Sequence, residues 1–118
     1  MTTPASTPSA AERQRQLKQH YREAGPAMGV FAVRNRASGR VRVRASLNVA
    51  GAMQRMRFEL GLGQHRDAAL MAEWRRDGAA QFEFELLDTL KKRDDPAHDY
   101  RAELDALLAL WREELGDA

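Results

Sequence analysis

Three arginines alternate with small apolar residues in a stretch that could contact a polyanion. These arginines are Arg40, Arg42 and Arg44. Side chains of a β-strand alternate between its two faces, so we expect the three guanidinium groups on one face and Val41 and Val43 on the other, against the core. Two residues along a strand advance by about 6.6 Å, close to the roughly 6–7 Å between successive phosphates of a nucleic-acid strand. The pattern therefore predicts a face that binds a phosphate backbone.

Further arginines follow on the next predicted helix and extend this basic surface. The predicted nucleic-acid-binding set comprises Arg40, Arg42, Arg44, Arg55 and Arg57. An alternative remains open, in which the strand face is merely solvated and its arginines pair with acidic side chains. The candidate partners in that case are Glu59, Glu83 and Glu85.

Few other residues form a pattern that could do chemistry. The chain has no cysteine, which excludes disulfides, thiolate metal sites and cysteine nucleophiles. The histidines His20, His65 and His98 fall in different segments without a paired spacing, so we predict no metal site; His65 is expected to cap or pack in a loop. Ser46 has no partner base in its motif, which argues against a hydrolase nucleophile. We expect no cofactor.

Charge is distributed unevenly along the 118 residues. Residues 1–57 carry 11 basic and 2 acidic side chains, a net of +9, whereas residues 58–118 carry 8 and 15, a net of −7. A basic half favours a polyanionic partner, although the two halves could also neutralise each other in the fold. No apolar run approaches the roughly 20 residues of a membrane span. We expect a cytoplasmic protein with no membrane partner.

The chain divides into a short N-terminal region and one folded domain. Residues 1–10 are predicted to be a disordered tail, residues 11–27 a helix and linker, and residues 28–116 the domain. Segments 28–35 and 40–47 form a predicted hairpin, because a short Gly-containing loop joins two strand-like runs. A third strand is expected around residues 82–86, where phenylalanine and leucine alternate with glutamate.

Predicted helices occupy the rest of the domain. Asn48 and Asp67 are candidate N-caps of two helices, and a long helix with an apolar stripe ends the chain. Trp74 and Trp111 lie on the apolar stripes and are expected to anchor the core. The predicted fold class is α+β, with a small three-stranded antiparallel sheet flanked by helices.

Several segments together resemble the GIY-YIG nuclease domain. The paired strands that open that family are similar to Met28–Asn35 and Gly39–Asn48, and the stretch from His65 to Phe84 resembles a later segment of many such domains. The resemblance implies the GIY-YIG-like fold over residues 28–116. It also implies divalent-metal-dependent cleavage of phosphodiesters, with a tyrosine in each strand, an arginine on the next helix and a metal-binding glutamate on a later one.

This chain departs from the family at each of those positions. The two tyrosines fall on Phe31 and Arg42, the arginine on Ala52 and the glutamate near Leu108. A phenylalanine has no hydroxyl to donate or accept a proton. Arg55, one turn beyond Ala52, is a possible substitute on the same helix.

These departures favour binding without cleavage. The predicted function is a GIY-YIG nuclease-like domain that binds nucleic acid, DNA rather than RNA, and does not cut it. One alternative is an active endonuclease with rearranged residues, which would need Mg²⁺. A second alternative is an adaptor that binds a protein partner through its acidic C-terminal helix or its hairpin. The oligomeric state is left open.

Overall fold

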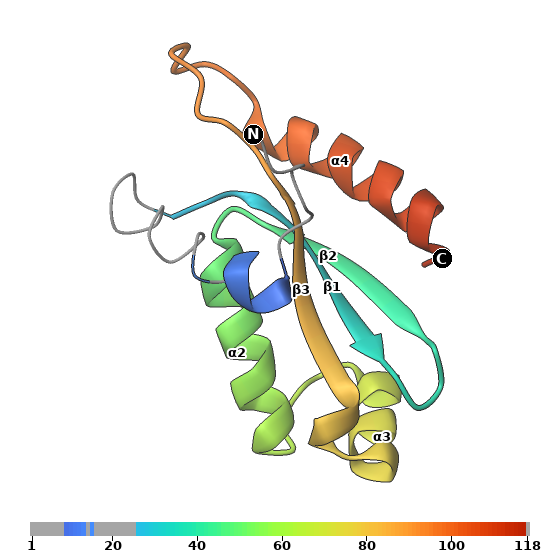
Figure 1. Ribbon diagram of the computed structural model, residues 1–118. Helices are drawn as coiled ribbons and strands as arrows, with labels where there is room; N and C mark the ends of the chain where they lie inside the picture. Colours follow the sequence, from blue (N-terminus) through green and yellow to red (C-terminus); the bar gives the residue numbers. More distant parts are fainter. Residues whose placement is uncertain (1–8, 14, 16–25, 118) are drawn as a thin grey trace, which may run out of the picture.

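A three-stranded antiparallel sheet forms the centre of the protein, as predicted. The computed structural model describes residues 9–13, 15 and 26–117. Strand β1 (Gly29–Asn35) lies between β2 (Val41–Ser46) and β3 (Phe82–Thr89), in the order β2-β1-β3. Both pairings are antiparallel. Figure 1 shows helices on both sides of this sheet, which confirms the α+β architecture.

Helical segments flank the sheet. Helices α2 (Val49–Gly61) and α3 (Ala68–Asp77) lie between β2 and β3 in the chain, followed by the short 3-10 helix η1 (Ala79–Gln81). Helix α4 (Tyr100–Leu115) ends the domain. Residues 10–13 and 15 are also helical; the rest of the predicted tail and N-terminal helix lies outside the described residues.

Local hydrogen bonds explain where the helices begin. The Asn48 side chain accepts from the Gly51 amide at 3.1 Å, and Asp67 accepts from the Leu70 amide at 3.0 Å. Each bond satisfies an amide that the first helical turn leaves without an intrahelical partner. Both predicted N-caps are therefore confirmed. Helix α3 ends at Gly78, whose positive φ of 87° favours glycine.

Strand β1 is buried on both faces and separates two apolar layers. On one face, Phe31 and Val33 pack with Met53 of α2 and Leu70 of α3 in the main core. The alternate β1 residues Val30 and Ala32 point to the opposite face and are fully buried, as are Val43 of β2 and Leu104 of α4. Helices α2 and α3 thus cover one face of the sheet, and α4 covers the other (Figure 1).

The two tryptophans contribute unequally to the core. Trp74 packs against the main core, with its ring 5.0 Å from that of Phe82. Trp111 is only half-buried, and the one fully buried residue of α4 is Leu104. The expectation that Trp111 anchors the core is therefore wrong: its side chain is left partly exposed, and its Nε1 donates to the exposed carboxylate of Asp88 at 3.4 Å. None of the helices in the described part of the chain combines the length and apolar character that crossing a bilayer requires.

Candidate nucleic-acid interface

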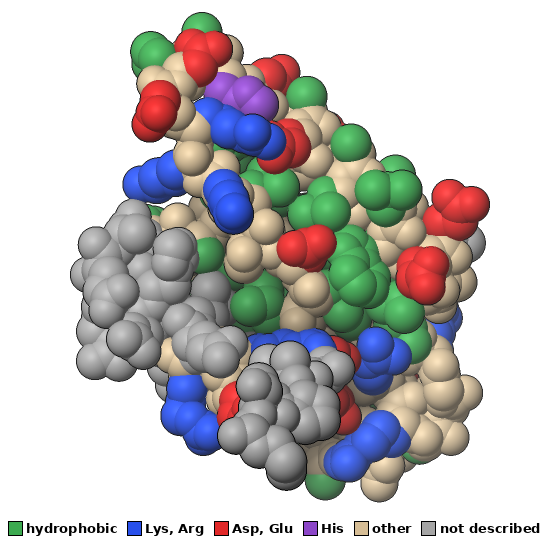
Figure 2. Space-filling model, turned by 45° about the horizontal axis from the view of Figure 1, so that its top comes forward, with side chains coloured by type: hydrophobic (Ala, Val, Ile, Leu, Met, Phe, Trp, Pro, Cys, Tyr) green, Lys and Arg blue, Asp and Glu red, His purple; other side chains and the backbone are tan. Residues whose placement is uncertain are grey.

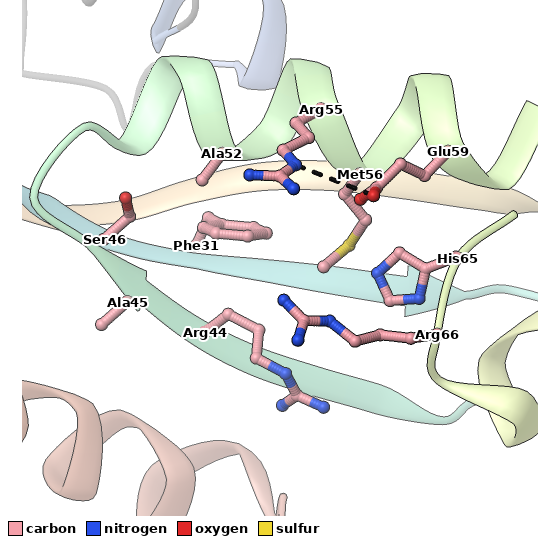
Figure 3. A pocket seen from close by; sticks show the side chains of 10 residues that line it. All are labelled: Phe31, Arg44, Ala45, Ser46, Ala52, Arg55, Met56, Glu59, His65 and Arg66. Atoms are coloured by element: carbon pink, nitrogen blue, oxygen red, sulfur yellow. Dashed lines mark ion pairs between the residues drawn. The ribbon is translucent and has the colours of Figure 1, made fainter.

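An open cleft lies between β2, α2 and the loop that precedes α3. Its volume is about 230 Å³, and Figure 3 shows the side chains around it. Phe31 of β1 forms its apolar floor, with its ring almost wholly covered. The lining residues are Phe31, Arg44, Ala45, Ser46, Ala52, Arg55, Met56, Glu59, His65 and Arg66.

Positive charge predominates among the side chains of this cleft. Arg44 comes from β2, Arg55 from α2 and Arg66 from the loop before α3. Figure 3 shows Arg55 and Arg66 extending into the cleft from opposite sides, while Arg44 points away from Phe31. The one carboxylate in the lining is Glu59, whose Oε2 lies 3.7 Å from Nε of Arg55. Three cations and one anion leave the cleft suited to a negatively charged ligand.

The three arginines differ in how strongly their side chains interact with other residues of the protein. Arg66 forms no hydrogen bond or ion pair with any residue that the structure describes. The side chain of Arg55 is 74% exposed, and its pair with Glu59 is long. Arg44 is held more firmly, because its Nη1 lies 3.2 Å from Oδ2 of Asp117. Arg55 and Arg66 are therefore the guanidinium groups most available to a ligand.

His65 also lines the cleft, and its ring orientation is set by the loop. Its Nδ1 accepts a hydrogen bond from the Asp67 amide at 3.1 Å, within the loop that leads to α3, in agreement with the expectation that His65 caps or packs in a loop. Because Nδ1 accepts, the neutral ring carries its proton on Nε2. Nε2–H is thus a potential donor to a ligand in the cleft.

Arg42 is not part of this exposed surface. Its side chain is 4% exposed, and its Nη2 donates to Oε2 of Glu73 at 2.6 Å. The second carboxylate near it is Asp67, at 3.8 Å from its Nε. Alternation does place Arg42 on the same face as Arg40 and Arg44, but α3 covers the middle of that face. The expectation that all three arginines project into solvent is therefore wrong for Arg42.

A buried polar network surrounds this ion pair. The Asn35 amide nitrogen donates to Oε1 of Glu73 at 3.2 Å and to Oδ2 of Asp77 at 2.7 Å. The hydrogen bond from Arg42 lowers the pKa of Glu73, against the opposing effect of burial, and Asn35 lowers it further. Hydrogen bonds from Arg76 and then Asn35 lower the pKa of Asp77 to about 2. Both carboxyl groups are therefore ionised at neutral pH and bind α3 to the sheet.

The strand arginines do have acidic partners, though not those predicted. Arg40 Nη1 lies 3.5 Å from Oε2 of Glu73, and Arg44 Nη2 lies 3.9 Å from Oδ2 of Asp67. The hydrogen bond from the Leu70 amide lowers the pKa of Asp67, and the charges of Arg42 and Arg44 add to this effect. The partners expected from the sequence were Glu59, Glu83 and Glu85. Among the described residues, Glu59 and Glu85 form ion pairs with other arginines instead.

The structure brings together only part of the predicted binding set. Arg44 and Arg55 both line the cleft, whereas Arg40 lies outside it, in the loop that precedes β2. Arg57 is on another side of α2, with its guanidinium carbon 4.6 Å from the centre of the Phe84 ring. Sequence reasoning missed Arg66, although it follows His65 within a segment that carries the family resemblance.

The positions equivalent to the family's catalytic residues are also only partly assembled. Phe31 and Ala52 line the cleft, and Arg55 reaches it from one turn beyond Ala52. Leu108 belongs to α4, across the sheet from the cleft, and Arg42 is engaged with Glu73. Ser46 is used locally, since its hydroxyl accepts from the Asn48 amide at 3.0 Å.

These residues do not fit the divalent metal that the family resemblance implies. Such an ion needs several oxygen ligands arranged around one point. Glu59 is the one acidic residue in the lining and lies against Arg55. Among the described residues, no three histidine or acidic side chains gather in a way that could hold a metal ion.

Comparison with known proteins finds solved structures with a similar fold. No protein-family model matches the sequence. No curated protein matches it either. Among solved structures, the catalytic domain of homing endonuclease I-TevI is similar, with a TM-score of 0.61 and 19% identity over 75% of this chain and 88% of that one. A mutant of the catalytic domain of intron endonuclease I-TevI gives a TM-score of 0.61 and 18% identity over 76% of this chain and 84% of that one. The chain therefore has a GIY-YIG-like fold.

Proposed function

We propose that this chain is a nucleic-acid-binding domain that holds a phosphate backbone in its cleft and does not cleave it. The observation that carries the proposal is that Arg44, Arg55 and Arg66, from three separate elements, line one cleft, with Arg55 and Arg66 extending into it. Guanidinium groups bind phosphate through paired hydrogen bonds. The likeness of the fold to endonuclease catalytic domains supports nucleic acid as the source of that phosphate, and homing endonucleases make DNA the first ligand to test.

The composition of the cleft supports binding rather than hydrolysis. Phe31 offers a ring without a hydroxyl at the floor of the cleft. The guanidinium of Arg42 stays protonated and cannot act as a base, and it is already bonded to Glu73. Leu108 falls near the position of the family's metal-binding glutamate and lies on α4, and Glu59, the one carboxylate in the lining, lies against Arg55. What remains in the cleft is positive charge, which holds a polyanion in place.

The binding proposal is tested by neutralising the two available guanidinium groups. Arg55→Gln together with Arg66→Gln removes two phosphate contacts and leaves the buried network intact. Each lost contact flattens the dependence of log K on log salt by about 0.9 for duplex DNA, so the double variant should lose nearly two units of slope. Fluorescence anisotropy with labelled single- and double-stranded DNA and RNA over a salt series measures this.

Arg57→Gln is the matched control. It is compared with Arg55→Gln alone, since each removes one charge from α2, but Arg57 lies over Phe84 and does not line the cleft. We expect it to keep the wild-type slope. Equal losses in both variants would indicate a diffuse charge effect and not a binding cleft, and an absence of wild-type binding at low salt would reject the proposal.

The absence of cleavage needs its own test, because His65 and Glu59 both line the cleft and are the side chains through which an active endonuclease could work. We expect wild-type protein to leave plasmid DNA and RNA intact with either Mg²⁺ or Mn²⁺. Nicking that disappears in His65→Ala or Glu59→Gln would establish an active endonuclease with rearranged residues.

A further inference from the structure

An apolar groove lies on α4, across the sheet from the basic cleft. It has a volume of about 310 Å³ and is lined by Asp88, Leu107, Leu110, Trp111 and Glu114. Leu110 is 64% exposed and shares the groove with the half-buried Leu107 and Trp111, so it is part of a contiguous apolar patch and not a single exposed side chain. Figure 2 shows hydrophobic side chains gathered on this part of the surface, with acidic side chains at their margin.

The spacing of the groove residues is that of a helix-packing seam. Leu107, Leu110, Trp111 and Glu114 occupy positions i, i+3, i+4 and i+7 of α4. Residues at this spacing form one stripe along a helix, and such stripes pack against a second helix. Leu104 is fully buried beneath α4, whereas in this second stripe Leu107 and Trp111 are half-buried and Leu110 is exposed. The seam therefore fits an amphipathic helix better than a small molecule.

Charge around the groove restricts what that helix can be. Asp88 and Glu114 are its only charged lining residues, both are exposed, and neither forms an ion pair with a described residue. Asp88 also accepts a hydrogen bond from Nε1 of Trp111 at 3.4 Å. Uncompensated carboxylates beside an apolar stripe attract a cationic partner and repel a second acidic one. Two copies of α4 would place these carboxylates opposite each other.

We propose that this groove is a docking site for a basic amphipathic helix of a partner protein. Leu107, Leu110 and Trp111 provide the apolar contact, with Trp111 as its anchor, since tryptophan is enriched among the residues that dominate binding energy. Asp88 and Glu114 select lysine and arginine at the edges of the bound helix. Because α4 and the cleft lie on opposite faces of the sheet, the domain can hold a nucleic acid and this partner at the same time.

The test uses two synthetic helices as probes. One, of about 18 residues or five turns, carries leucine at i, i+3, i+4 and i+7 with lysine elsewhere; the other replaces every lysine with glutamate. Binding is followed by tryptophan fluorescence in full-length protein with Trp74→Phe, which leaves Trp111 as the sole reporter. We expect the lysine peptide to bind and shift the emission, and the glutamate peptide to have no effect.

Variants of α4 then locate the binding surface. Leu110→Glu should weaken binding about tenfold or more, and circular dichroism should show an unchanged fold because Leu110 is exposed. Ala109→Glu adds the same charge to the neighbouring exposed position, which points away from the seam, and should leave the affinity unchanged or slightly higher.

Three results would overturn the proposal. These are equal binding of both peptides, equal affinity of Leu110→Glu and wild type, and no binding of the lysine peptide at millimolar concentration. Light scattering adds a separate check on the occupant. A wild-type dimer that becomes a monomer in Leu110→Glu would show that the groove binds a second copy of this chain instead.

Discussion

The buried pair of Arg42 and Glu73 should be the most sensitive point of the domain. The two side chains are 4% and 8% exposed, and 2.6 Å separates Nη2 from Oε2. Replacing Glu73 with alanine leaves the Arg42 guanidinium buried, with Asp67 at 3.8 Å as its remaining carboxylate. Breaking one side of a buried ion pair typically costs about 3–5 kcal/mol. We therefore expect Glu73→Ala to lose about 3 kcal/mol or more of the free energy of unfolding.

The reverse change should cost less. In Arg42→Met, the Glu73 carboxylate keeps the Asn35 amide at 3.2 Å and Arg40 at 3.5 Å. It can also take up a proton, which an arginine cannot lose. The double variant Arg42→Met with Glu73→Met removes both charges and should be far more stable than the sum of the single effects predicts, because well-packed apolar residues often replace a buried ion pair at little cost.

The pH dependence supplies an independent check. The folded-state pKa of Glu73 is lowered, first by the hydrogen bond from Arg42. A lowered pKa contributes stability that is fully present above the unfolded pKa of a glutamate, about 4.3, and is lost as the pH falls through the folded value. In Arg42→Met the main cause of that shift is gone, so less stability should be lost between about pH 5 and pH 3.

Urea unfolding followed by circular dichroism measures all these quantities, at pH 7 and over a series of lower pH values. A Glu73→Ala variant within about 1 kcal/mol of wild type would show that water or another group solvates Arg42, and would refute the reasoning. Additive single effects in the double variant would likewise show that the two residues do not act as a pair.

Two further predictions concern packing and capping. Leu104→Ala should lower the free energy of unfolding by about 2–5 kcal/mol, because it opens a cavity in a fully buried site. Trp111→Ala should lower it clearly less, because Trp111 is half-buried. Urea titrations of both variants give the comparison, and a larger loss in Trp111→Ala would show that the groove end of α4 carries the packing. Asp67→Ala should cost about 1–2 kcal/mol, since it removes the α3 cap at the Leu70 amide; Asp67→Asn keeps an N-capping side chain and should recover most of the loss in melting temperature.

The sequence predicted much of the fold because its signals are local. Hairpin strands, caps and the final helix each follow from a few neighbouring residues, as at Asn48 and Asp67. The burial of Arg42 is different in kind. Alternation shows which side chains share a face of β2 but not how much of that face another element covers, and Glu73 lies 31 positions away in the chain. Only the packed position of α3 brings the two together.

The cleft was predictable to a similar, limited extent. Arg44 and Arg55 were found because they belong to periodic elements, where position along the element implies a direction. Arg66 lies in a loop without a period, so nothing local indicates that its side chain enters the cleft. Trp111 shows the converse error: a residue can lie on an apolar stripe and still be only half-buried, because the stripe does not show how much of it another element covers.

The replacement of the family's two tyrosines by Phe31 and Arg42 has one physical explanation. At both positions the resembled family uses a hydroxyl, whereas this chain has a buried side chain with a structural role. Phe31 fills the floor of the cleft, and Arg42 binds α3 to the sheet through Glu73. A buried tyrosine hydroxyl would need a hydrogen-bond partner, whereas a phenylalanine ring needs none. The positive charge lost to burial at Arg42 is matched at the cleft surface by Arg55 and Arg66. If the cleft holds a phosphate backbone, as we propose, the chain has exchanged groups that move protons for groups that fix a fold and attract a polyanion. That exchange would give a GIY-YIG-like fold whose basic cleft, as proposed above, binds a polyanion without cleaving it.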